Sequence, residues 1–367
     1  MKYTLKSGWI PTRIRRILAR MTIYAAWYGQ ELWGMSQVRV NDAESQIEDL
    51  VSWTHGTSKQ RGVTTKLMAR ELNLPPLHAV ASGARARVFL KGRTQKTFIK
   101  ELVETPGVTG AWSAVTYACL CRDLRAKDVL VLKDIMKDPR DLGPEFPEWI
   151  IKMKKQIKAA AWSSHEGKKG SSLKYYREIG LWKTQPWYWH NGWEDSIGSI
   201  SLMQIRAGCF NWNSGYKRWY LEATHNLDIG KYLHCRACKE EGGELGELNA
   251  LRHMFLDCPD PVRTEARKRM NDEIKAIEQL PTTMPPLELK PADKEASKWA
   301  KAYRSKGDPD AKVALLLGGY NSEHGKTVWC ENNRGDGIYK CVIRYLDAAT
   351  MHEHMQNYQP GGPGNAY

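Results

Sequence analysis

Three cysteines and one histidine between residues 235 and 258 have the most specific chemistry in this chain. Their order is Cys235-x2-Cys238-x14-His253-x4-Cys258. Two thiolates two residues apart can bind one metal from a tight turn, and a histidine and a third cysteine can complete a tetrahedral shell. The pattern predicts a Cys3His site for a structural Zn²⁺. Because the protein fills every coordination position, none is left for a catalytic water.

The sequence around the last two ligands predicts how they are held. Apolar residues flank His253, and Pro259 directly follows Cys258. This arrangement is typical of a short helix that presents the imidazole from its first turn and ends at the cysteine. The loop over residues 239–252 is rich in Gly and Glu and has no fixed structure of its own. A bound zinc would supply the folding free energy that such a small module lacks.

Apolar residues recur at helical spacing along much of the chain, so a mainly α fold is predicted. The predicted helical segments are 12–33, 42–55, 63–72, 77–104, 147–162, 197–230, 261–280 and 294–317. Asp42 is the predicted N-cap of the second segment. The segment 261–280 reads as a charged helix that includes Arg263, Arg267, Lys268 and Arg269.

The chain carries a strong positive charge, with 55 Lys and Arg against 41 Asp and Glu and a formal net charge of +14. This balance favours a polyanionic partner such as RNA or DNA. We expect phosphate contacts from two basic clusters, although a solvated face of an amphipathic helix accounts for either one equally well. The predicted contact residues are Arg13, Arg15 and Arg16 in the first cluster and Lys152, Lys154, Lys155, Lys158, Lys168 and Lys169 in the second. Seven Tyr and Trp residues follow between 175 and 193, a composition typical of a groove for single-stranded nucleic acid.

No apolar run approaches the length of about twenty residues that crosses a bilayer, and the first residues show no signal-peptide pattern. We therefore expect an intracellular protein, in the nucleus or the cytoplasm. In a reducing compartment, clustered cysteines are metal ligands rather than disulfides. We predict neither a membrane nor a small-molecule partner.

No group of residues predicts a catalytic site. Residues 319–327 end in Gly-Lys-Thr, but five residues separate the two glycines where a phosphate-binding loop needs four. A metal-dependent endonuclease formed by the region after residue 290 has only weak support, from Asp310, Glu323 and Lys326. That enzyme, and an inactive relic or interaction module, remain alternatives to nucleic-acid binding.

Four stretches, in this order along the chain, resemble one known family. They are Ile23-Tyr-Ala-Ala-Trp-Tyr-Gly-Gln-Glu-Leu-Trp-Gly34, Leu72-Asn-Leu-Pro-Pro-Leu77 with Ala84-Arg-Ala-Arg87, Met203-Gln-Ile-Arg-Ala-Gly208, and the Cys3His set. The family is the non-LTR (LINE-type) retrotransposon reverse transcriptases, in which such stretches follow the polymerase core and end in a zinc knuckle. The resemblance covers roughly residues 10–100 and 197–260. It implies a C-terminal part of such an RNA-directed DNA polymerase, since the fingers and palm with their catalytic aspartates are not recognisable.

Together these observations predict a helical thumb-like region, then a small zinc-knuckle module, then a short α/β or irregular C-terminal region. The expected domains are a thumb-like region at 1–104, a basic and aromatic connecting region at 105–196, and a helical lead-in with the zinc knuckle at 197–280. A proline-rich linker at 281–292 and a C-terminal region with a disordered tail at 293–367 complete the chain. The expected function is binding of element RNA or target DNA.

Overall fold

A computed structural model of the protein describes nine stretches of the chain, together with isolated positions between 77 and 181. The stretches are 12–26, 37–54, 65–74, 196–207, 235, 237–238, 251–283, 291–318 and 340–350. The elements of this part are helices, and none of its residues lies in a strand. The prediction of a mainly α fold is therefore confirmed for the described residues. The thumb-like arrangement and the overall fold of the C-terminal region stay predictions.

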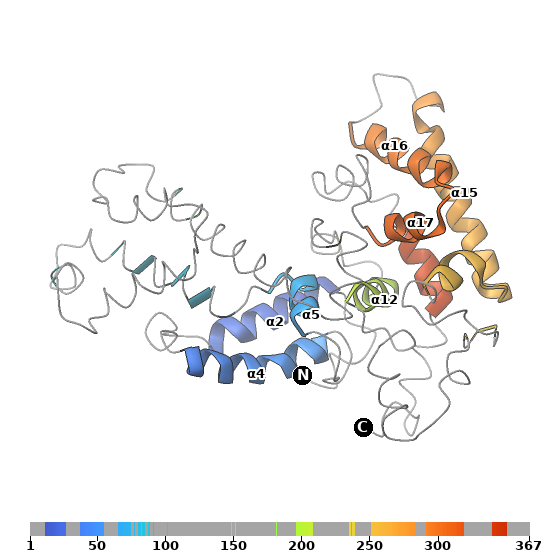
Figure 1. The fold of residues 1–367 in the computed structure, drawn as a ribbon. Coiled ribbons are helices and arrows are strands. Elements are labelled where there is room, and N and C mark those ends of the chain that lie inside the picture. Colours follow the sequence, from blue (N-terminus) through green and yellow to red (C-terminus); the bar gives the residue numbers. More distant parts are fainter. Residues whose placement is uncertain are drawn as a thin grey trace. The chain divides into compact units, whose positions relative to one another are not determined.

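The N-terminal described part contains three helices, α2 (Thr12–Ala26), α4 (Gln37–Thr54) and α5 (Thr65–Glu71) (Figure 1). The predicted start of α4 at Asp42 was wrong, because the helix begins five residues earlier and Asp42 lies inside it. Val40 is 1% exposed, so burial of its side chain stabilises the additional turn of the helix.

Helix α5 ends at Glu71, four residues before Pro75. The backbone N–H of Leu72 still donates to the carbonyl of Met68, at 3.0 Å. Asn73 then adopts a positive φ of 55°. Asn tolerates this left-handed conformation better than most residues, and it commonly ends a helix.

The chain divides into two compact units. The larger contains residues 1–19, 49–73 and 169–367, and the smaller contains residues 20–48 and 74–168. Within the smaller unit, Glu44 Oε1 accepts a hydrogen bond from the backbone N–H of Leu77, at 2.9 Å. The predicted domain boundaries at 104, 196, 280 and 292 stay predictions.

Helix α12 (Ser196–Arg206) lies in the core of the larger unit, where residues 198–207 are all buried. It packs closely on the helical residues 340–350: a Cβ atom on Gly198 would lie 2.5 Å from the carbonyl oxygen of Ile343. The hydroxyls of Ser201 and Thr350 are 2.8 Å apart. Only a residue without a side chain allows this approach of the two backbones.

A buried ion pair joins α12 to α5. Arg206 Nε and Nη2 donate to the two carboxylate oxygens of Glu71, at 2.9 and 3.2 Å, and both side chains are almost completely buried. Arg206 Nη1 donates to the carbonyl of Leu317, which follows α17. One guanidinium therefore connects three segments that are far apart in the sequence.

Three helices lie between Cys258 and Gly318: α15 (Pro261–Thr283), α16 (Pro291–Ser305) and α17 (Pro309–Leu316). Each begins with proline, whose missing N–H is not needed in the first turn. Helices α15 and α16 pack side by side and antiparallel (Figure 1), since Ser297 bonds to Glu278 while Tyr303 bonds to Asn271.

Helices extend into both ends of the predicted linker at 281–292. Helix α15 runs through Pro281 to Thr283, and α16 already starts at Pro291. A proline so close to a helix end removes few backbone hydrogen bonds, so the helix tolerates it. The helical segment predicted at 294–317 corresponds to α16 and α17. It ends at Gly318, which has a positive φ of 73°.

Candidate metal centre

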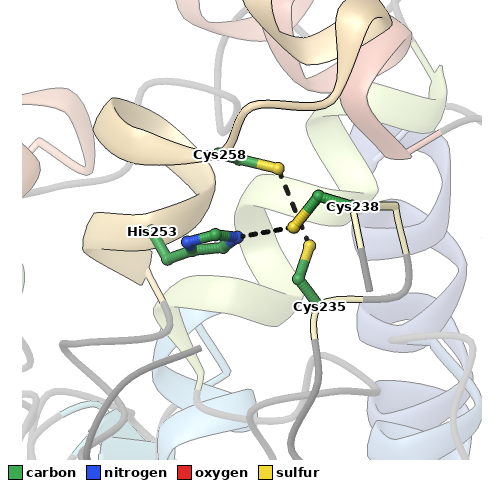
Figure 2. Close-up of side chains that lie close together, drawn as sticks. All are labelled: Cys235, Cys238, His253 and Cys258. Atoms are coloured by element: carbon green, nitrogen blue, oxygen red, sulfur yellow. Dashed lines mark hydrogen bonds between the residues drawn. The ribbon is translucent and has the colours of Figure 1, made fainter. Parts of the chain in front are cut away.

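The side chains of Cys235, Cys238, His253 and Cys258 gather at one point, where Figure 2 shows them directed toward a common centre. Their ligand atoms all lie within 4.8 Å of one another. The Sγ atoms of Cys235 and Cys258 are 3.7 Å apart, and Cys238 Sγ is 3.3 Å from His253 Nε2. The structure thus brings together all four residues that the sequence singled out as metal ligands.

Two of these separations are close to the edges of a tetrahedral zinc site. Zn–S bonds of about 2.3 Å and Zn–N bonds of about 2.05 Å place two sulfurs about 3.8 Å apart and a sulfur and a nitrogen about 3.6 Å apart. The observed distances of 3.7 and 3.3 Å are close to these two edges. The group can therefore hold a metal ion, and three thiolates with one imidazole suit Zn²⁺.

A wide helical turn presents the second pair of ligands. His253–Asp257 form the π-helix η5, and the backbone N–H of Cys258 donates to the carbonyl of His253, at 2.6 Å. Residues five apart then lie nearly above one another, which an α-helix would not allow. Cys258 itself leaves the helix at φ −58° and ψ 122° because Pro259 follows it. The short helix was predicted from the sequence, but its π geometry was not.

Positive charge and backbone donors surround the thiolates. Burial raises the pKa of the Cys235 thiol, but the backbone N–H of Cys238, the charge of Arg263 and the N–H of Ala237 outweigh it. The net result is a pKa below the usual range. Arg263 Nη1 lies 2.9 Å from Cys235 Sγ. A lowered pKa favours the thiolate, which is the form that binds a metal.

Helix α15 also holds the backbone of Cys258. Arg267 Nη2 donates to the carbonyl of Cys258, at 2.6 Å, and Thr264 Oγ1 donates to the same oxygen, at 3.4 Å. From the sequence, Arg263 and Arg267 were identified only as members of a charged helix over 261–280. Their contact with the centre could have been predicted from their position. Both lie in the first two turns of the helix that follows Cys258-Pro259, and side chains of these turns point back toward the preceding cysteine.

Among the residues predicted to contact nucleic acid, the structure describes the side chains of Arg15 and Arg16. Arg15 is 0% exposed, and its Nη1 donates to the carbonyl of Thr54, at 3.1 Å. Arg15 therefore stabilises packing inside the larger unit instead of presenting charge to a phosphate, which corrects the prediction for this residue. Arg16 is half-buried. The side chains of Arg13, Lys152, Lys154, Lys155, Lys158, Lys168 and Lys169 lie outside the described residues.

Within the part of the chain that the structure describes, the Cys3His set is the one group of three or more His, Cys, Asp or Glu side chains that could hold a metal ion. Asp310 lies at the start of α17, where its backbone N–H donates to Asp308 Oδ1, at 3.0 Å. Glu323 and Lys326 lie outside the described residues. No helix among the described residues combines the length and the apolar character that a membrane crossing requires.

Comparisons with protein-family models, with curated proteins and with solved structures each found no match.

Proposed function

We propose that this chain binds nucleic acid and that one structural Zn²⁺ stabilises the fold that does so. The observation that carries the proposal is the convergence of three cysteines and one histidine, whose ligand atoms lie within 4.8 Å of one another, with two separations close to the edges of a zinc tetrahedron. The net charge of +14 supports a polyanionic partner. Element RNA or target DNA, bound by a C-terminal part of a LINE-type reverse transcriptase, is the partner that the sequence resemblance favours.

The surface of α15 and α16 is less suited to this role than the lysine-rich segment at 152–177. Exposed basic residues on the two helices are interspersed with exposed acidic ones such as Glu265 and Asp272. Between residues 152 and 177 the sequence has eight basic residues and one acidic residue. A local excess of one sign attracts a phosphate backbone more strongly than a mixed surface.

The test is the salt dependence of RNA and DNA binding, measured by fluorescence anisotropy with the zinc-loaded protein. Changing Lys152, Lys154, Lys155 and Lys158 together to Ala should weaken binding. It should also reduce the slope of log K against log salt by about 3 to 4, since each lost phosphate contact contributes about 0.7 to 0.9. A matched variant removes the same charge elsewhere, from the exposed Lys268, Lys275, Lys294 and Lys301.

Three outcomes decide the proposal. A slope that changes only in the first variant supports the lysine cluster as the contact surface. Equal changes in both variants indicate that net charge alone drives binding. A wild-type protein that carries no zinc, or that binds neither RNA nor DNA at low salt, contradicts the proposed function.

A further inference from the structure

Arg263 occupies a buried position between the metal centre and the C-terminal helical residues. It lies in the first turn of α15, where its backbone N–H donates to Asp260 Oδ1, at 2.9 Å. This N-terminal cap of α15 fixes the backbone position of Arg263, from which its side chain extends. Its Nη1 lies 2.9 Å from Cys235 Sγ and 3.7 Å from Cys258 Sγ. The residue is only 2% exposed.

The charges of the centre explain why a cation belongs at this position. One Zn²⁺ with three thiolates and a neutral imidazole carries a net charge of about −1. Cys235 and Cys258 are buried, and a buried charge is costly unless a partner of opposite sign is close and hydrogen-bonded. The guanidinium supplies one positive charge beside two of the three sulfurs, which makes the whole group electrically neutral.

The same guanidinium also reaches a segment about ninety residues later in the chain. Arg263 Nε donates to the carbonyl of Ala349, at 3.3 Å. Nearby, the ring of Tyr345 packs on Phe255 with the centroids 5.3 Å apart, and the Tyr345 hydroxyl donates to the carbonyl of Met254. Helical residues 340–350 thus contact both η5 and the arginine that bonds to the thiolates.

We propose that Arg263 is the positive counter-charge of the zinc–thiolate centre and that, through it, the bound metal holds helical residues 340–350 in place. This inference rests on the proposed zinc centre. According to this inference, the metal stabilises the core of the larger unit and not only the short segment that carries its four ligands. A lysine could supply the charge, but its donors share a single nitrogen, whereas Arg263 donates from Nη1 to Cys235 Sγ and from Nε to the Ala349 carbonyl.

The test compares Arg263→Gln with the matched variant Arg269→Gln on the same helix, where the Arg269 side chain is 74% exposed and pairs with Glu265. Zinc affinity is measured by competition with a chromogenic chelator. Hydrogen–deuterium exchange of residues 340–350 is measured by mass spectrometry at saturating zinc. Arg263→Gln should weaken zinc binding about 10- to 100-fold and should speed exchange in residues 340–350, while Arg269→Gln should change neither.

Measurements that need no disruptive variant keep the inference testable if Arg263→Gln fails to fold. Removing zinc from the wild-type protein should speed exchange in residues 340–350 as well as in residues 251–258. Arg263→Lys should bind zinc more tightly than Arg263→Gln and still show faster exchange in residues 340–350.

Two results overturn the inference and leave the zinc centre standing. The first is that Arg263→Gln binds zinc as tightly as the wild-type protein does. The second is that hydrogen–deuterium exchange of residues 340–350 in the wild-type protein is the same with and without zinc. A wild-type protein that binds no zinc overturns the proposed function as well, so the two failures can be told apart.

Discussion

Replacing Cys258 by Ser tests the metal centre most directly. The side chain of Cys258 is 0% exposed, and its sulfur is one of the four ligand atoms. Serine keeps nearly the same shape but offers a poor zinc ligand, so three ligands remain. At a zinc concentration 100 times the dissociation constant, zinc stabilises the wild-type fold by about 2.7 kcal/mol. If the substitution lowers the affinity 100-fold, the same concentration contributes only about 0.4 kcal/mol.

Cys341→Ser is the matched control. Cys341 is also buried, at 1% exposed, but it is not one of the four ligands. Burial, followed by the hydrogen bond with Glu273, raises the pKa of its thiol, so this cysteine stays protonated at neutral pH. Both substitutions bury a hydroxyl in place of a thiol, which costs about 1 to 3 kcal/mol. Only Cys258→Ser should lose the part of the stability that depends on zinc.

The assay is urea unfolding of each protein with saturating zinc and with excess chelator, together with the zinc content of the purified protein. The difference between the two unfolding free energies isolates the contribution of the metal, because the cost of the buried hydroxyl is present in both measurements. We expect a difference of more than about 2 kcal/mol for the wild type and for Cys341→Ser, and close to zero for Cys258→Ser. Full zinc content and undiminished zinc stabilisation in Cys258→Ser would refute the assignment of this ligand.

Three further predictions concern the fold around the centre. Glu71→Ala removes the carboxylate partner of the buried Arg206 and should lower the unfolding free energy by about 3 to 5 kcal/mol in urea titrations; a change below about 1 kcal/mol contradicts the buried pair. Gly198→Ala should destabilise the protein, because the new Cβ would meet the carbonyl of Ile343 at 2.5 Å. A gain of about 0.5 to 1 kcal/mol, as expected from helix propensity alone, would show that the close packing is absent. Burial raises the pKa of Tyr303 to about 12, against a weaker opposing effect of a nearby arginine, so the folded state holds this proton more tightly than the unfolded state does. The resulting stability is present below pH 10 and is lost as the pH rises from about 10 to 12, so Tyr303→Phe should show a shallower loss of stability than the wild type over that range.

Several features of the site were predictable from local sequence. A C-x2-C pair and an H-x4-C pair predict one metal-binding group, because these spacings are typical of zinc ligands in a tight turn and at the end of a short helix. The structure brings the four side chains together. The prolines at 261, 291 and 309 coincide with helix starts, since φ of proline is already suited to the first turn.

Features that depend on long-range contacts were not predictable. Arg15 looked like a phosphate contact, yet it bonds to the carbonyl of Thr54, 39 residues away. The start of α4 moves to Gln37, consistent with the burial of Val40. In each case a distant partner or a buried surface decides the outcome, and neither is visible in a window of neighbouring residues.

The sequence by itself determined the chemistry of the metal centre, because ligand type and spacing are local properties of the chain. Tertiary structure decided which charged side chains lie beside that centre and which lie elsewhere in the fold. Arg263 and Arg269 lie on one charged helix, yet Arg263 is buried against two sulfurs and Arg269 is mostly exposed. The physical reason is that the free energy of a charge depends on its burial and on its partners, and both are fixed only when distant segments pack.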